Sequence, residues 1–229
     1  MRCMLEGKSL RACADEVGIC LKTSFEWRHK ILAAIRALEG GISFSGIVEA
    51  DELLMNYSEK GRKFKSKEEY QRAKRKKHPK VAILVVTDRE GNLLFKQVGE
   101  KKVKNEQLRY ELKNRLSENN LICVKPKKEF KKAVKSLQSK KVIVNKRQIK
   151  RGIYSVKIVE SKISDFKTWL SRFHGVATKY LQSYLMWFVI MNKYLKELIY
   201  PDIGRLLNLS SHDRWAWDKY REIISQRYD

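Results

Sequence analysis

The sequence predicts an α/β protein, in which a mixed sheet with helices on its faces is preceded by a helix-turn-helix. Two observations support this fold class: after residue 42, Ile- and Val-rich segments alternate with amphipathic helical segments, whereas the first 41 residues show helical spacing only. With 43% hydrophobic residues, the 229-residue chain can form one sizeable core. We expect three parts: a helix-turn-helix over residues 1–41, a sheet domain over 42–195 and a helical tail over 196–229.

The first part has the pattern of two helices joined by a glycine turn. Leu10, Ala14 and Val17 recur at helical spacing, Gly18 interrupts the pattern, and a longer helical pattern follows from residue 23. Such pairs are typical of DNA-binding helix-turn-helix units, although a helical hairpin that only packs on the main domain is the alternative. The side chains that would contact DNA are Lys22, Arg28, His29 and Lys30.

The pattern of residues 42–195 predicts a meander of strands followed by alternating helices and strands. The expected strands are 42–55, 81–86, 93–98, 121–124 and 141–144, and the expected helices are 103–116, 127–137, 158–169 and 178–194. One more helix is expected near residues 215–224 of the tail. This element order is that of an RNase H-like domain. Such domains gather carboxylates from the first strand, a neighbouring strand and a later helix, and hold two divalent ions for phosphodiester chemistry.

The charge is high and concentrated. Fifty Lys and Arg residues against 26 Asp and Glu give a net charge of +24, of which residues 56–80 contribute +8 (11 − 3) and residues 125–151 contribute +11 (12 − 1). One-sign clusters favour a polyanion partner, and we expect nucleic acid rather than a membrane because no basic amphipathic anchor stands out. No apolar run is long enough to cross a bilayer. Double-stranded DNA is the first expectation and RNA the alternative. The basic arm over 56–80 would contact DNA through Arg62, Lys63, Lys74, Arg75, Lys76 and Lys77.

Two carboxylates lie within an apolar strand, in the sequence GIVEADEL. Glu49 and Asp51 share one face of the strand because alternate residues point the same way, and Glu52 points to the other face. Two acids near a core are costly unless a cation or a hydrogen-bond network holds them. The alternative is an exposed strand edge.

Three stretches of the chain resemble the DDE transposases of bacterial insertion sequences, of the ISXO type. These are SLRACADEVGICLKTSFEWRHKIL (9–32), GIVEADELLMNYSEKGRK (46–63) and residues 152–188, which contain FHGVATKYLQSYLMWF. The resemblance implies that Asp51 and Glu160 are catalytic and hold Mg²⁺ or Mn²⁺, with Glu49 just behind them. It also implies that Lys167, about two helical turns after Glu160 and on the same face, contacts DNA at the site.

The resemblance fails at the second catalytic Asp, whose position is taken by Lys125. The acids that can replace it are Glu129, four residues on, and Asp88, which is more typical of a hairpin turn. The family also usually begins with a zinc ribbon, so we expect a shortened, degenerate copy. We therefore expect an insertion-sequence transposase impaired in strand cleavage and transfer or, as the alternative, an inactive DNA-binding protein.

The resemblance also implies partners and a location. The partner would be double-stranded DNA, as transposon ends and target, bound by a homo-oligomer. The expected location is the bacterial cytoplasm, in association with the nucleoid.

Overall fold

The N-terminal part is helical, as the sequence predicts. The computed structural model describes residues 2–76, 78–137, 139–144, 150–151, 153–193 and 216–225. Helix α1 (Arg2–Leu5) is followed by α2 (Leu10–Val17), α3 (Leu21–Ile35) and the 3-10 helix η1 (Arg36–Gly41). The Ser9 hydroxyl accepts the Ala12 N–H and begins α2, and Gly18 ends α2 in the left-handed conformation with φ of 70°. The helix–glycine–helix geometry therefore matches the prediction, and DNA reading by this unit stays a prediction.

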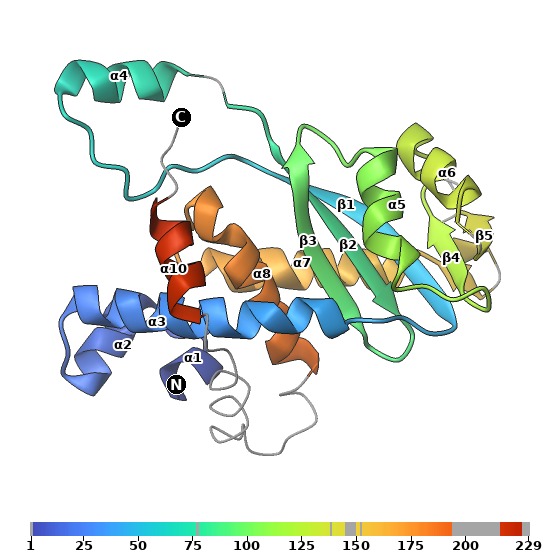
Figure 1. Cartoon of the computed structure of the whole chain (residues 1–229), viewed down its shortest axis with the longest axis horizontal. Helices are drawn as coiled ribbons and strands as arrows, with labels where there is room; N and C mark the ends of the chain where they lie inside the picture. The colour runs from blue at the N-terminus through green and yellow to red at the C-terminus, as the bar shows by residue number, and fades with distance from the viewer. Residues whose placement is uncertain are drawn as a thin grey trace.

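A five-stranded mixed sheet forms the centre of the molecule, in the order β3-β2-β1-β4-β5 (Figure 1). The strands are β1 (Ile47–Met55), β2 (Val81–Asp88), β3 (Leu93–Glu100), β4 (Leu121–Val124) and β5 (Lys140–Ile143). Strands β1, β2 and β3 pair antiparallel, whereas β4 pairs parallel to β1, and β5 parallel to β4. All five predicted strands are confirmed, and the sheet with its helices fits the predicted RNase H-like fold.

Helices cover both faces of this sheet. Helix α7 (Lys157–Ser171) packs on β1 and β2, and α8 (Thr178–Lys193) packs on β3. Figure 1 shows α5 (Asn105–Lys113) on the opposite side of the sheet from α7 and α8, with α6 (Lys128–Lys135) beside α5. A short pair, β6 (Lys150–Arg151) and β7 (Tyr154–Ser155), leads into α7, and α10 (Ala216–Ser225) packs on α3. No helix within the described ranges is both long and apolar enough to cross a membrane.

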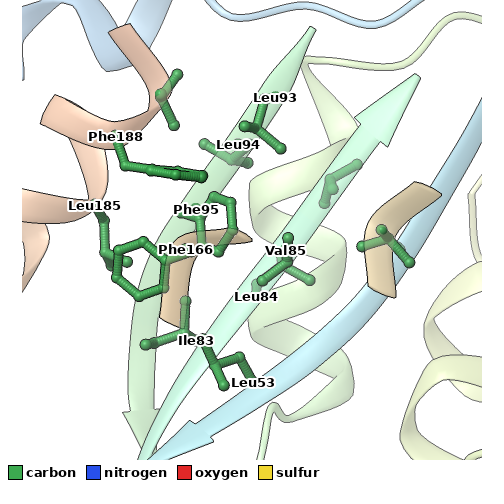
Figure 2. Close-up of a cluster of buried hydrophobic side chains, with 14 of the residues drawn as sticks. Leu53, Ile83, Leu84, Val85, Leu93, Leu94, Phe95, Phe166, Leu185 and Phe188 are labelled. Atoms are coloured by element: carbon green, nitrogen blue, oxygen red, sulfur yellow. The ribbon is translucent and has the colours of Figure 1, made fainter. Parts of the chain in front are cut away.

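The core between the sheet and α7 and α8 combines aliphatic side chains with the rings of Phe95, Phe166 and Phe188 (Figure 2). The Phe95 ring of β3 lies 5.0 Å from Phe166 of α7 and 5.6 Å from Phe188 of α8, measured between centroids. Strand β2 is buried along its whole length. Helix α7 also packs on β1 and β2, so its start has a defined position beside β1.

The basic arm begins after β1 and returns at β2. It contains a helix, α4 (Lys67–Arg75), which stands away from the body of the protein in Figure 1. The base of the arm is tied down: Ser58 and Thr178 exchange two hydrogen bonds of 2.8 Å. Lys60 Nζ also donates to the His174 and Gly175 carbonyls at 2.7 and 2.9 Å. The arm is thus fixed where it leaves the sheet and exposed at α4.

Candidate functional site

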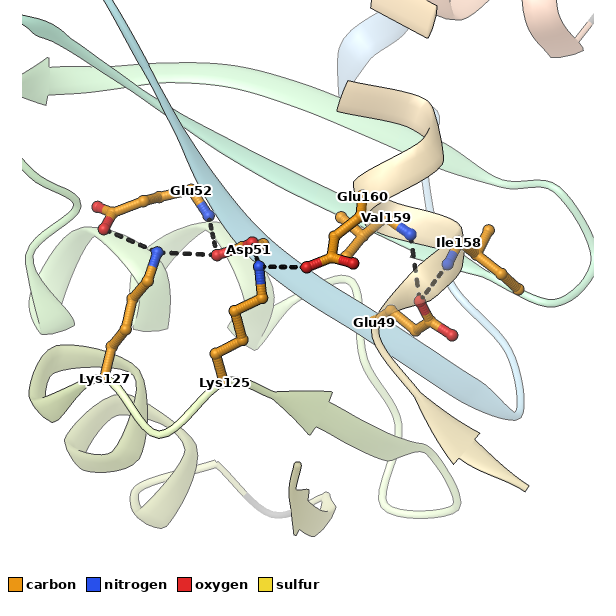
Figure 3. Close-up of polar contacts among 8 residues, drawn as sticks. All are labelled: Glu49, Asp51, Glu52, Lys125, Lys127, Ile158, Val159 and Glu160. Carbon is orange, nitrogen blue, oxygen red and sulfur yellow. Dashed lines mark hydrogen bonds and ion pairs between the residues drawn. The ribbon is translucent and has the colours of Figure 1, made fainter. Parts of the chain in front are cut away.

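Three elements bring charged side chains together beside β1 (Figure 3). Strand β1 carries Glu49 and Asp51, and the parallel pairing of Ala50 with Val124 places Lys125 next to Asp51, just after β4 ends. The first turn of α7 carries Glu160. The structure therefore brings together Asp51, Glu160 and Lys125, the three positions that the sequence singled out.

The ammonium group of Lys125 lies between the two acids. Its Nζ is 2.6 Å from Asp51 Oδ2 and 2.6 Å from Glu160 Oε1. The Asp51 side chain is 5% exposed, Lys125 26% and Glu160 40%, so the site is buried at Asp51 and reaches solvent at Glu160. The cation that holds Asp51 and Glu160 is therefore a side chain of the protein itself.

A second lysine holds the other oxygen of Asp51. Lys127 Nζ lies 2.9 Å from Asp51 Oδ1 and 2.9 Å from Glu52 Oε1. The Glu52 backbone N–H also donates to Asp51 Oδ1, at 2.8 Å. Both carboxylate oxygens of Asp51 therefore have hydrogen-bond donors.

The two lysines keep Asp51 ionised. Burial acts to raise the pKa of Asp51, but the hydrogen bonds from Lys125 and Lys127 outweigh burial and bring the pKa below its usual 3.8. Burial acts to lower the pKa of Lys125, but Asp51 and Glu160 outweigh it and raise that pKa. The site is therefore a charged network at neutral pH.

Glu49 has a different role from Asp51, although the two share a face of β1. Its Oε2 accepts the backbone N–H groups of Ile158 and Val159 at 2.9 and 3.1 Å, at the start of α7. Its Oε1 accepts the Ser155 hydroxyl at 3.0 Å, and Arg89 Nη2 lies 3.4 Å away. A carboxylate at these free N–H groups caps the helix from another element and favours its dipole. Glu49 therefore fixes the first turn of α7, and with it Glu160, against β1.

The residues present do not fit a divalent ion. Mg²⁺ needs oxygen ligands that are free to coordinate it, whereas the lysines hydrogen-bond to both Asp51 oxygens and to Glu160 Oε1. A +2 ion about 4 Å from an ammonium group is repelled by about 2 kcal/mol even in water. Within the part of the chain that the structure describes, no cluster of three or more Asp, Glu, His or Cys side chains suits a metal.

Neither replacement acid joins the site. Glu129 pairs with Lys102, at 3.0 Å between Oε1 and Nζ. Asp88 lies at the end of β2 and accepts the backbone N–H groups of Ser45, Glu90 and Asn92 at 2.9–3.0 Å, so it is the hairpin turn residue that its sequence context indicates.

The predicted DNA contacts separate into exposed and buried groups. The exposed ones are Lys22, Lys63, Lys74, Arg75, Lys76 and Lys167. Arg62 is partly buried and paired with Glu59 and Glu69, and Lys30 lies over the Trp27 ring. Lys77 lies outside the described residues.

The expectation for Arg28 and His29 is corrected by their burial, at 3% and 4% exposed. Arg28 Nη2 donates to the Lys8 carbonyl at 2.7 Å, and the His29 ring centroid is 4.1 Å from that of Tyr180. Both side chains face the interior because α3 packs on α8 through this side. In this structure they are packing residues.

Sequence reasoning missed Lys127 and Glu52. Lys127 is two residues after Lys125, across Pro126, and alternate residues of an extended segment share a side. That spacing is a signal that both lysines reach the same acid.

Comparison with protein families gives one match over the sheet domain. Residues 43–192, more than half of the chain, match the ISXO2-like transposase domain. Neither the curated proteins nor the solved structures gave a match.

Proposed function

The chain belongs to the ISXO2-like transposase family, and from that premise we propose a DNA-binding transposase of the insertion-sequence type whose strand cleavage and transfer are impaired. The observation that carries the proposal is the Lys125 ammonium group 2.6 Å from both Asp51 and Glu160. Cleavage of the two-metal type requires carboxylates that bind two ions. In this chain the same carboxylates neutralise Lys125 and Lys127.

The charge distribution supports the DNA-binding half of the proposal. The net charge is +24, and the exposed cations include Lys22 near the start of α3, Lys63 and Lys74 in the arm, and Lys167 on α7. Binding through such groups releases counterions from DNA and needs no divalent ion. The protein would therefore bind DNA without a divalent ion and lose affinity steeply as salt rises.

The experiment compares wild type with Lys125→Asp and with Lys125→Asp/Lys127→Ala. Supercoiled plasmid carrying the DNA that flanks the gene is incubated with each protein in Mg²⁺ or Mn²⁺, and nicked and linear products are measured. We expect wild type to bind the DNA without cleaving it and the double variant to cleave it. Adding Asp51→Ala to the double variant is expected to abolish that cleavage. Wild-type cleavage that requires a divalent ion and disappears in Asp51→Ala would refute the impairment.

A thermal measurement serves as the folding control. Lys125→Asp concentrates carboxylates around Asp51, so Mg²⁺ is expected to raise the melting temperature of this variant through binding to its folded state. Wild type is expected to show no such rise. A wild-type melting temperature that increases with Mg²⁺ would contradict the proposal that Lys125 and Lys127 keep a divalent ion from Asp51 and Glu160.

A further inference from the structure

Helix α6 places four lysines on one side. Lys128, Lys131, Lys132 and Lys135 have the spacing i, i+3, i+4 and i+7, and all four are exposed. The other side of the helix packs into the core through Phe130, Ala133 and Val134. We call these lysines the α6 lysine face.

This arrangement is unfavourable for the helix by itself. Like charges three or four residues apart repel, and the face contains four such pairs. Lys128 and Lys131 also lie in the first turn, where the helix dipole disfavours cations. The one acid of the helix, Glu129, hydrogen-bonds Lys102, which lies before α5. A local cost of this kind is expected where a sequence serves a ligand.

The face borders a hollow of about 330 Å³ between α6 and the edge strand β5. Lys141 of β5 joins the four α6 lysines around it, and its apolar lining includes Val124, Pro126 and Ile143. No acidic residue is found among the described residues that line it. The lining thus combines apolar and cationic side chains, a surface suited to a sugar–phosphate chain.

The size of the face favours a polymer over a single anion. Lys128 and Lys135 are about 10 Å apart along the helix axis, from a rise of 1.5 Å per residue. Each strand of DNA carries one charge per about 3.4 Å of axis, so this length matches about three phosphates. A free phosphate ion would face only one or two of the lysines.

We propose that the α6 lysine face is a binding site for the phosphate backbone of duplex DNA, separate from the arm and the helix-turn-helix. This inference rests on the DNA-binding part of the proposed function. An RNA backbone is one alternative occupant. Another interpretation is a solvated face whose lysines only keep the edge strand β5 from pairing with other chains.

The test replaces Lys128, Lys131, Lys132 and Lys135 by Gln, which removes the charges and keeps a good helix former. The control variant replaces four exposed cations on or before α5, namely Lys101, Lys104, Arg109 and Lys113, by Gln. Anisotropy of a labelled duplex gives the dissociation constant between about 50 and about 200 mM salt. Thermal unfolding of each free protein is measured in parallel.

Two opposite effects are expected for the α6 variant. Its free form melts at a higher temperature than wild type because the repulsion is gone. Its DNA affinity falls about tenfold or more. The plot of log affinity against log salt becomes less steep by about 2.7 to 3.6, at about 0.9 for each of three to four lost phosphate contacts. The control variant is expected to change the slope by about 1 or less.

The outcomes separate this inference from the proposed function. If wild type does not bind duplex DNA at low salt, DNA binding itself fails. If wild type binds and the α6 variant loses no more slope than the control, the α6 site is overturned and DNA binding stands. If the α6 variant loses binding to duplex RNA but binds duplex DNA as wild type does, the α6 site for DNA is also overturned.

Discussion

Replacing Lys125 by Met removes the charge that joins Asp51 to Glu160 and nearly preserves the side-chain length. Asp51 is 5% exposed and would keep Lys127 and the Glu52 backbone N–H as donors. Glu160 is 40% exposed, so water can replace the ammonium group at its carboxylate. The variant therefore leaves the buried Asp51 carboxylate with fewer hydrogen-bond donors, and it creates no large cavity.

The expected loss of unfolding free energy is about 2 kcal/mol. Breaking a fully buried ion pair by removing one partner costs about 3 to 5 kcal/mol, whereas an exposed pair contributes about 0 to 1 kcal/mol. The Lys125 network lies between these limits because Asp51 is buried and the two other groups reach solvent. In a chain of this length about 2 kcal/mol corresponds to a fall of about 4 to 8 °C in melting temperature.

The pH dependence of this loss tests its cause. The pKa of Asp51 is below its usual 3.8, so its contribution to stability is present above that value and disappears as the pH falls through the lowered folded-state pKa. Urea unfolding of wild type, Lys125→Met and a surface control, Lys113→Met, at pH 7 and at about pH 3 gives the comparison. If Lys125→Met lowers the unfolding free energy by the same amount at both pH values, or does not lower it at pH 7, the proposed electrostatic role of Lys125 is refuted.

Three more substitutions test other parts of the structure. Glu49→Gln removes the charge that caps α7 and is expected to cost about 1 to 2 kcal/mol in urea unfolding, whereas Glu118→Gln on the surface is expected to be neutral within about 0.5 kcal/mol. Burial lowers the pKa of His29 to about 3 from 6.5. As the pH falls, the unfolded state therefore binds the proton first, and the unfolding free energy of wild type decreases by about 2 kcal/mol between pH 6.5 and about pH 5. His29→Phe is expected to remove that loss, and equal pH profiles would contradict it. Gly18→Ala places a side chain at φ of 70° and is expected to lower the melting temperature, with a cost of about 1 kcal/mol.

The sheet could be predicted because its strands carry strong local signals. Residues 81–86 are apolar throughout, as a strand buried on both faces requires, and Asp88 with Gly91 marks the turn to β3. Alternation also placed Glu49 and Asp51 on one face of β1. What alternation does not show is that Glu49 caps α7, because that contact joins residues about 110 positions apart.

The DNA-contact prediction for α3 was less successful for a physical reason. The basic residue types of Arg28 and His29 favour a surface position, but α3 is packed on α8 and α10. Arg28 is buried where its guanidinium lies 5.3 Å from the Trp187 ring centroid. A sequence pattern shows which residues share a helix face, but not which neighbouring element covers that face.

The interlocked charges of Asp51, Lys125 and Lys127 also restrict how the site can change by single substitutions. Loss of Lys125 removes one of the two ammonium groups that hold the buried carboxylate, and loss of Asp51 takes from both lysines the acid that they share. A substitution that only removes one of these charges is therefore expected to lower the stability of the fold. The electrostatics that hold the lysines at this site therefore also favour retention of Asp51, because its loss would cost stability even in a protein that does not use it for cleavage.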